Sequence, residues 1–403
     1  TALTAPIAIP IMKRGGYTAE QAAAIEAIAS TGGQITPPIL GLAAFLMADF
    51  LGIPYATIVV ASILPALLFY LGLLAYVTLD YRRRATRAAI TSSAESSPHA
   101  SVHLLRAGVS FVVPMGILLT LIIEGASVQT AVLAAILAVA VLALVLRIER
   151  NPRVWLRGLV DAAVTGASIG MAAGVLDVLM TSLDITQLGI LIGFVVSELA
   201  GGSRLGTLLI LIVASYIMGM GMPGIAIYAV LAVTLVPVMT NIGVAPIVAH
   251  FLLMYMIIMS NFTPPVAPTL VITAKIADAR YMAAGWEAMK AGAGAMFLPF
   301  LIFLYPALLL QNATFATIAE ALGVSLLVIF LLTISLTGWF GRPLSMVERL
   351  ALIAGPLLVW TARYQDATLL YSIFLAATGI MAMWLVRIGR SNGTPAYRVA
   401  ARG

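Results

Sequence analysis

A Thr-Pro-Pro tripeptide occurs twice in this chain, each time in the middle of a long apolar segment. The first copy lies in GGQITPPI, which ends at Ile39, and the second lies in MSNFTPPV, which ends at Val266, 227 residues later. Each proline removes a backbone N–H donor and clashes with the preceding helical turn. Lipid cannot satisfy the freed carbonyl groups, so such backbone persists at membrane depth only inside protein or beside a cavity. The sequence therefore predicts two interrupted helices that border a polar site.

The likeness between the two copies extends upstream of the tripeptides. At equal distances from the two threonines, the sequence has Pro10, Met12 and Gly16 in the first copy and Pro237, Met239 and Gly243 in the second. Residues 5–39 and 232–266 share 8 identities in 35 positions, concentrated at glycine and proline. Paired interrupted helices in corresponding halves are the best sequence indication of a binding site in a secondary transporter.

The composition is that of a polytopic membrane protein. Of 403 residues, 62% are hydrophobic and only 9% are charged, and the mean hydropathy is +1.08, far from the values of soluble domains. The absence of cysteine excludes disulfides and thiolate metal sites, and three histidines are too few for a histidine-rich metal site. The net charge of +6 does not indicate a nucleic-acid partner, because the basic residues sit in short loops, where they orient a membrane protein.

Ten apolar stretches are long enough to cross about 30 Å of hydrocarbon. They are residues 17–50 (broken at Thr36), 54–79, 107–123, 127–146, 164–183, 244–273 (broken at Thr263), 291–311, 318–338, 347–362 and 367–386. Residues 186–200 are too short to span. We expect 203–240 to enter and return as a re-entrant hairpin with the glycine-rich stretch 219–224 at its tip. By symmetry, residues 1–16 are the returning arm of an equivalent hairpin, so we expect the natural N-terminal part to be missing.

The basic loops set the expected orientation. They are residues 80–87, 147–157 and 275–290 and the RIGR tail, all of which should be cytoplasmic. This orientation places 20 of the 22 lysines and arginines on the cytoplasmic side of the membrane and leaves only Arg204 and Arg363 on the outer side. It requires 203–240 to be re-entrant, puts the C-terminus in the cytoplasm, and makes the two broken helices cross in opposite directions. An inverted repeat is therefore expected from charge as well as from the duplicated peptide.

We divide the chain into five parts. These are a first repeat half (1–80), a flexible cytoplasmic linker (81–103), connecting or scaffold helices (104–202), a second repeat half (203–312) and a separate C-terminal appendage of three helices (313–403). Two charged-edge segments, VWLRGLVDA and ADARYMAAGWEAMK, are expected to lie in the cytoplasmic interface, with Trp155 and Trp286 at headgroup level.

Three strings resemble the large membrane subunit of TRAP transporters. They are ASTGGQITPPILGLAAFLMADFLGIPY, YIMGMGMPGIAIYAVLA, and FTPPVAP followed by the GW of GWEAMK. The chain is most similar to the fused membrane proteins that work with TAXI-type binding proteins; residues 1–312 carry the likeness, and the final ninety residues resemble the extra C-terminal helices of those proteins.

The resemblance implies an all-α, inverted-repeat elevator that imports an organic acid with sodium, in the inner membrane of a bacterium or archaeon. It implies an extracytoplasmic TAXI-type binding protein as a partner, and a small membrane subunit or fused N-terminal helices that are missing here. No cofactor besides the coupling sodium ion is implied. The chain departs from the family after GMGMP, where Gly224 and Ile225 replace the small hydroxyl residues often found in relatives.

Each helix break is a candidate sodium site, because freed carbonyls and the negative ends of half-helices suit a cation. At the first break the expected ligands are Ser30, Thr31, Gly32, Gly33, Gln34 and Thr36. At the second break they are Gly219, Met220, Gly221, Ser260, Asn261 and Thr263. The alternative is that these residues only kink helices for packing; the duplicated tripeptide, with an amide two residues before each threonine, favours the ion sites.

A carboxylate substrate is expected between the breaks, facing half-helix N-termini and the exposed amides of the hairpin tip. No arginine lies at that depth in the sequence, so binding would depend on dipoles, amides and the charge of sodium. The expected substrate contacts are Ser30, Thr31, Asn261 and Met222.

Four ionisable residues in apolar segments have functional and structural interpretations. Glu26 precedes the first break by about two turns and is either structural or part of the coupling. Asp177 is interpreted as a polar contact satisfied by a partner, Asp49 as an interfacial residue, and His250 as a packing or hydrogen-bonding residue.

Two other functions remain as alternatives. The first is a sodium- or proton-coupled carboxylate carrier that works without a binding protein. The second is an intramembrane serine hydrolase, because GASIG at 166–170 fits G-x-S-x-G and would pair Ser168 with His250. That motif needs a strand-turn-helix elbow, whereas here it opens a transmembrane segment in which small residues serve close packing.

Overall fold

The computed structural model describes residues 4–38, 40–85, 100–146, 151–186, 188–201, 203–220, 224–311, 313–365 and 368–391. Within those ranges the chain is built of α-helices, with one short 3-10 helix and no β-strand, and it has several long apolar helices. The predicted all-α polytopic membrane fold is confirmed.

The first repeat half contains an interrupted helix at the predicted position. Its helices are α1 (Ala5–Arg14), α2 (Ala19–Gly32), α3 (Leu42–Leu51) and α4 (Tyr55–Ala85). A capping box formed by Thr18 and Gln21 starts α2, and Gly52 ends α3 in the left-handed conformation at φ 62°, which glycine adopts without a steric penalty. The break around Thr36 therefore separates two half-helices, as the prolines predicted.

The second repeat half has the same order of elements. Its helices are α9 (Arg204–Gly219), α10 (Gly224–Asn241), α11 (Pro246–Ser260), α12 (Pro268–Ala277), α13 (Tyr281–Ala291) and α14 (Ala293–Leu304). The break around Thr263 separates α11 from α12, and α9 and α10 pack together as a helical hairpin. Both predictions are confirmed. The re-entrant path of that hairpin stays a prediction, because α10 by itself is long and apolar enough to cross a membrane instead of turning back within it.

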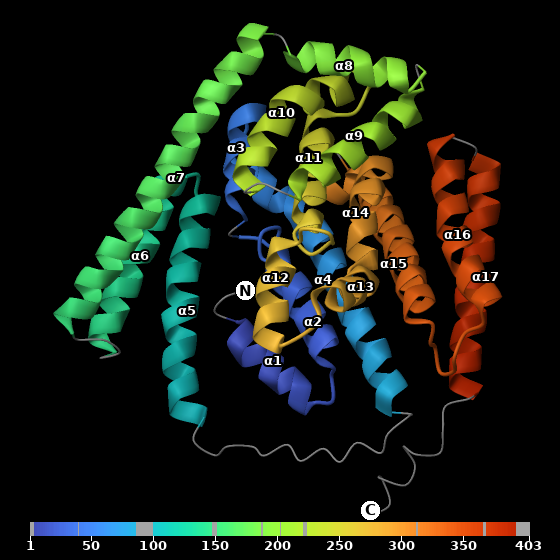
Figure 1. Ribbon diagram of the computed structural model, residues 1–403, viewed down its shortest axis with the longest axis horizontal. Coiled ribbons are helices and arrows are strands. Elements are labelled where there is room, and N and C mark those ends of the chain that lie inside the picture. Colours follow the sequence, from blue (N-terminus) through green and yellow to red (C-terminus); the bar gives the residue numbers. More distant parts are fainter. Residues whose placement is uncertain are drawn as a thin grey trace, which may run out of the picture.

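The two halves run in opposite directions. In Figure 1, α2 and α3 lead upward through their break, whereas α11 and α12 lead downward through theirs. The turns before the two broken helices are alike in detail: the Tyr17 N–H donates to the Met12 carbonyl at 3.1 Å and the Val244 N–H to the Met239 carbonyl at 3.0 Å. Gly16 and Gly243 adopt φ angles of 85° and 86°. The inverted repeat expected from the sequence is present in the backbone.

Each half-helix packs against elements of the other half. The alanine-rich α2 packs on α12 and α13, and α3 packs on α10 and α11. The second break approaches α13 at Gly285, where an added Cβ would lie 2.2 Å from Cγ of Pro264. The segment ADARYMAAGWEAMK forms α13, which lies against both α2 and the second break; its position in the cytoplasmic interface stays a prediction. Trp286, which was predicted to lie at headgroup level, has a side chain that is 60% exposed.

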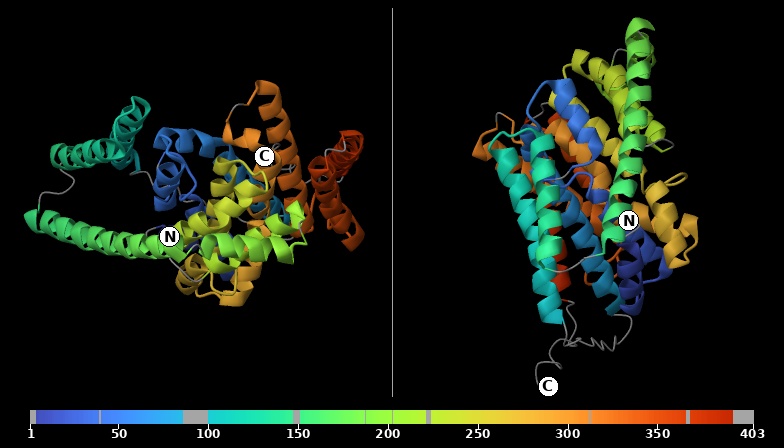
Figure 2. Two further views of the ribbon diagram at one scale, coloured as in Figure 1. Left: turned by 90° about the horizontal axis from the view of Figure 1, so that it is seen from above. Right: turned by 90° about the vertical axis from the view of Figure 1, so that its left-hand side faces the viewer.

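The connecting helices extend away from this core. They are α5 (Ala100–Ile123), α6 (Val128–Val145), α7 (Pro152–Thr186) and α8 (Leu188–Leu199). Figure 2 shows α5, α6 and α7 reaching out to one side, and α8 lies across the end of the core in Figure 1. The segment VWLRGLVDA, predicted to be a separate interfacial helix, is the first part of the continuous α7. No helix-breaking residue separates it from the apolar stretch that follows, so the helix runs on.

The C-terminal part also differs from the expected separate appendage. After the 3-10 helix η1 (Pro306–Leu309), it forms α15 (Phe315–Thr337), α16 (Met346–Tyr364) and α17 (Thr368–Ser391). Helix α15 packs against α4 and α14. Gly294 allows this approach, because a Cβ there would lie 2.7 Å from Ile329. Three helices are present as predicted, but the first belongs to the core.

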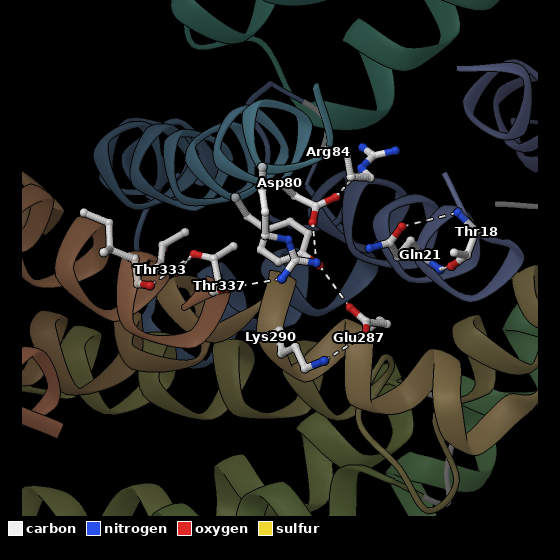
Figure 3. Close-up of polar contacts among 11 residues, drawn as sticks. Thr18, Gln21, Asp80, Arg84, Glu287, Lys290, Thr333 and Thr337 are labelled. Carbon is white, nitrogen blue, oxygen red and sulfur yellow. Dashed lines mark hydrogen bonds and ion pairs between the residues drawn. The ribbon is translucent and has the colours of Figure 1, made fainter. Parts of the chain in front are cut away.

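A polar network joins α4, α13 and α15 at the basic end of α4 (Figure 3). Asp80, whose side chain is 1% exposed, pairs with Arg83 at 3.1 Å and with Arg84 at 2.9 Å. Tyr76 donates to the Glu287 carboxylate of α13 at 3.2 Å, and Arg83 donates to the Thr337 carbonyl of α15 at 3.3 Å. These contacts fix the end of the core that the charge pattern assigns to the cytoplasm.

In the described part of the chain, few single helices are long and apolar enough to cross a membrane, because several are interrupted. Among the described residues, α4, α10 and α15 are long and apolar enough to cross a membrane by length and composition. The α13–α14 pair, bent by 47°, adds a fourth such segment if it is counted as one span. The α13–α14 pair corresponds to α4 of the first half, which is a single helix, so the two halves differ at this point.

Candidate substrate and cation site

A cavity of about 290 Å³ lies between the first helix break, the second arm of the hairpin and the end of α11. Its lining residues are Gln34, Gly41, Leu42, Ala43, Gly224, Ile225, Tyr228, Met254, Ile257 and Ile258. The volume is near the lower end of the range of about 300–1,000 Å³ typical of small-molecule sites. The two repeat halves meet here, because the first four residues belong to one half and the other six to the other half.

Two helix N-termini open onto this cavity. Helix α3 begins at Leu42 after the N-cap Gly41, which has no side chain to cap the first N–H groups. Helix α10 begins at Gly224, also at the cavity wall. Unpaired N–H groups and the helix dipole make such ends partly positive, so they favour a bound anion. Among the described residues that line the cavity, none is charged, and the polar side chains are those of Gln34 and Tyr228.

Tyr228 is held by a histidine behind the cavity wall. Its hydroxyl is hydrogen-bonded to Nδ1 of His250 at 2.6 Å, and both side chains are buried. Phe50 stacks on the His250 ring with centroids 6.1 Å apart. This contact joins α10, α11 and α3, and it confirms His250 as a hydrogen-bonding residue.

Oxygen atoms gather at the first break. The Thr36 hydroxyl donates to the Gly32 carbonyl at 2.6 Å and lies 3.4 Å from the Tyr70 hydroxyl of α4. Tyr70 in turn donates to the Ala29 carbonyl at 3.3 Å. Gly32 permits this approach, because a Cβ there would lie 2.8 Å from the Tyr70 oxygen. Carbonyl and hydroxyl oxygens of this kind are the ligands that hard cations prefer.

The second break repeats this pattern with a tyrosine from the hairpin. The Thr263 hydroxyl donates to the Met259 carbonyl at 2.9 Å, four residues back as at Thr36. The buried hydroxyl of Tyr216, on α9, lies beside Thr263 without a well-formed hydrogen bond. The hairpin touches the end of α11 at Gly219, where a Cβ would meet Oγ of Ser260 at 2.8 Å. Oxygen groups from the hairpin and the broken helix therefore converge at the second break.

The structure places some of the predicted site residues at the cavity and others away from it. Gln34, expected at the sodium site, lines the cavity, together with the start of α3. Thr31 is buried and donates its hydroxyl to the Ala27 carbonyl at 2.7 Å. Ser30 donates to the Glu26 carbonyl at 2.7 Å. Of the expected substrate contacts that lie in the described part of the chain, Ser30, Thr31 and Asn261 are not among the residues that line the cavity.

The remaining sodium candidates lie at the two breaks. Gly33 and Asn261 are the C-cap residues of α2 and α11, and Met220 is the C-cap residue of α9. The Ser260 hydroxyl donates to the Ile257 carbonyl at 2.6 Å. Gly221 and Met222 lie outside the described residues. Tyr70, Tyr216 and Tyr228 were missed, because a tyrosine in an apolar helix has no sequence pattern that separates it from a packing residue.

The acidic residues have varied surroundings. Glu26 is 6% exposed and accepts a hydrogen bond from the Thr4 hydroxyl at the start of α1. Asp49 is exposed near the end of α3, which agrees with its interpretation as interfacial. The side chains of Asp177 and Ser168 lie outside the described part, although both residues belong to α7. The GASIG motif therefore sits within a continuous helix, without the strand-turn-helix elbow of a serine hydrolase.

Comparison with known families assigns most of the chain to a transporter family. The family described as "Tripartite ATP-independent periplasmic transporter, DctM component" matches residues 1–317, which include both repeat halves, both breaks and the whole cavity. A search of curated proteins finds no match.

Proposed function

The chain belongs to the DctM component family of tripartite ATP-independent periplasmic transporters, and on this basis we propose that it imports a small organic acid together with sodium. The family consists of multi-pass membrane components of secondary transporters, which work with a periplasmic binding protein and a small membrane subunit. For this chain we propose a TAXI-type binding protein, residence in the inner membrane of a bacterium or archaeon, and a cytoplasmic C-terminus.

Support for a carboxylate substrate comes above all from the two helix N-termini that open onto one cavity. The first turns of α3 and α10 present backbone amides from opposite repeat halves, and such amides bind anions without a cationic side chain. The Gln34 side chain adds an amide group. A cavity of about 290 Å³ suits a small acid better than a large one.

Support for sodium coupling comes from the oxygen groups at the two breaks. In each, a threonine hydroxyl bonds to the carbonyl four residues earlier, and a tyrosine hydroxyl lies beside that threonine. Neutral oxygen ligands at the negative end of a half-helix bind a monovalent cation without a buried carboxylate. One ion at each break would place positive charge on two sides of a bound carboxylate.

We further propose that substrate crosses by an elevator movement. The broken helices, their hairpins and the cavity between them would move together as a transport unit. The outlying helices α5, α6 and α7 would remain as scaffold, since they extend from one side of the core.

The test is uptake by the complete transporter reconstituted in liposomes with its binding protein. Uptake should require an inward sodium gradient. Asn261→Ala should raise the sodium concentration needed for half-maximal uptake without lowering protein abundance, because Asn261 provides the only side-chain amide at the second break. Ser168→Ala is the control and should transport normally.

Two outcomes would contradict the proposal. Equal uptake driven by a proton gradient without sodium would favour a proton-coupled carrier. Loss of activity in Ser168→Ala together with normal uptake in Asn261→Ala would favour the hydrolase.

A further inference from the structure

Two tyrosines make the same contact at the two Pro-Pro turns. Tyr55 is the first residue of α4, and its hydroxyl donates to the Pro38 carbonyl at 3.2 Å. Tyr281 is the first residue of α13, and its hydroxyl donates to the Pro265 carbonyl at 3.0 Å. The contact occurs once in each of the two oppositely oriented halves. We therefore interpret it as a structural element that both helix breaks share.

Only the first of these tyrosines supports the wall of the cavity. The Tyr55 hydroxyl also accepts a hydrogen bond from the Leu40 N–H at 3.3 Å. It therefore holds the chain on both sides of residue 39, directly before the cavity-lining residues Gly41 and Ala43. The Tyr55 ring stacks on Phe45 of α3, with centroids 4.4 Å apart and planes 12° apart.

The second tyrosine has no such role. Pro265 and the residues that follow it are not among those that line the cavity in the described part of the chain. Tyr281 is also less buried than Tyr55, and no stacked ring accompanies it among the described aromatic pairs. The two tyrosines thus share one hydrogen bond and differ in what that bond positions.

We propose that Tyr55 is a positioning residue for the substrate cavity, whose hydroxyl holds the start of α3 so that its N-terminal amides face the bound anion. This inference rests on the proposed function, in which the cavity binds a carboxylate. Loss of the hydroxyl leaves the Pro38 carbonyl and the Leu40 N–H without their partner, and an unmet polar group inside the protein favours a backbone shift that gives it a new partner. A shift at this point would turn the amides of Leu42 and Ala43 away from the cavity.

These 403 residues contain no cysteine, which allows a direct test in the purified protein. Ala43→Cys places one thiol in the cavity wall. Its rate of labelling is measured with a sulfonate-bearing methanethiosulfonate reagent and with the trimethylammonium counterpart. Because the helix N-termini attract anions, the sulfonate reagent should react faster than the cationic reagent, after correction for their rates with a free thiol.

Tyr55→Phe in this background should reduce the preference for the anionic reagent several-fold, because both hydrogen bonds that hold the chain before α3 are lost and the N-terminal amides of α3 no longer face the thiol. Tyr281→Phe is the matched control, since it removes the same hydroxyl from the equivalent position, and it should leave the preference unchanged. If Tyr55→Phe does not fold, Phe45→Leu is used instead, because it removes the ring that stacks on Tyr55 and should lower the preference in the same direction.

The outcomes separate the inference from the function on which it rests. An unchanged preference in Tyr55→Phe, or an equal loss in Tyr281→Phe, would overturn the role of Tyr55 while leaving the carboxylate site intact. No preference in the Ala43→Cys parent would overturn the anion-binding cavity itself, and with it the inference.

Discussion

Gly32 is the residue at which a single added methyl group should do most damage to the first break. It is the last residue of α2 and faces α4. A Cβ at this position would lie 2.6 Å from Cε1 of Phe69, 2.8 Å from the Tyr70 oxygen and 2.9 Å from Cζ of Tyr70. Both rings must therefore move in Gly32→Ala, and with them the tyrosine hydroxyl beside Thr36.

The expected cost follows from three contributions. Overpacking of a tight interface costs about 1–3 kcal/mol. Loss of the hydrogen bond from Tyr70 to the Ala29 carbonyl adds about 1 kcal/mol. Alanine is favoured over glycine in a helix by about 1 kcal/mol, which offsets the second contribution. The net destabilisation is therefore about 1–3 kcal/mol.

The neighbouring glycine provides the matched control. A Cβ on Gly33 would meet only the Ser30 carbonyl oxygen, at 3.4 Å, and Gly33 has an ordinary helical φ of −58°. Gly33→Ala adds the same methyl group one residue away, without the clash against α4. We expect it to be neutral or slightly stabilising.

Two measurements test the reasoning. Thermal unfolding of the purified protein should give a lower midpoint for Gly32→Ala than for Gly33→Ala. Sodium titration of uptake should show a higher half-saturating concentration for Gly32→Ala, because the Tyr70 oxygen is displaced from the break. Equal midpoints and equal sodium responses in the two variants would refute the assignment of this contact to the cation site.

Three further substitutions test other contacts by thermal unfolding. Gly219→Ala should destabilise the protein by about 1–3 kcal/mol, because the new Cβ would lie 2.8 Å from Oγ of Ser260; an unchanged midpoint would show that the hairpin tip does not press on α11. Asp80→Asn should cost about 1–3 kcal/mol, because it removes the buried carboxylate that pairs with the partly exposed Arg83 and Arg84, and a loss below 1 kcal/mol would contradict this. Tyr228→Phe should cost about 1–3 kcal/mol by leaving Nδ1 of His250 unpaired, whereas a midpoint equal to that of the parent would mean that the histidine finds another partner.

Elements fixed by proline and glycine could be predicted from the sequence. The prolines at 37–38 and 264–265 located both breaks, because a missing N–H and a steric clash act locally, whatever surrounds them. Gly16 and Gly243 marked equivalent turns, since both adopt positive φ. The direction of the repeat followed from the charged loops, and the structure has the same antiparallel arrangement.

Features that depend on packing between distant segments could not be predicted. The cavity is bounded by Gln34 from one half and Tyr228 from the other, and no local pattern relates these two residues. The bend between α13 and α14 and the docking of α13 on α2 also depend on tertiary contacts. The charged edge of α13 suggested an interfacial helix but did not reveal its docking on α2, because hydrophobic patterning cannot distinguish a lipid surface from an alanine-rich protein surface.

The two halves keep a spacing of 227 residues through their Pro-Pro pairs, after which the second half is one residue shorter. Beyond the breaks, Tyr55 corresponds to Tyr281 and the left-handed Gly52 to the left-handed Asp278, both at a spacing of 226 residues. An ungapped comparison ends at Val266 and cannot find these pairs. A residue lost inside a helix would rotate every later side chain by about 100°, whereas an irregular break can absorb the loss. Both halves nevertheless keep the tyrosine contact to the second proline. The feature that they share is therefore the way in which the break is closed, and not the spacing along the chain.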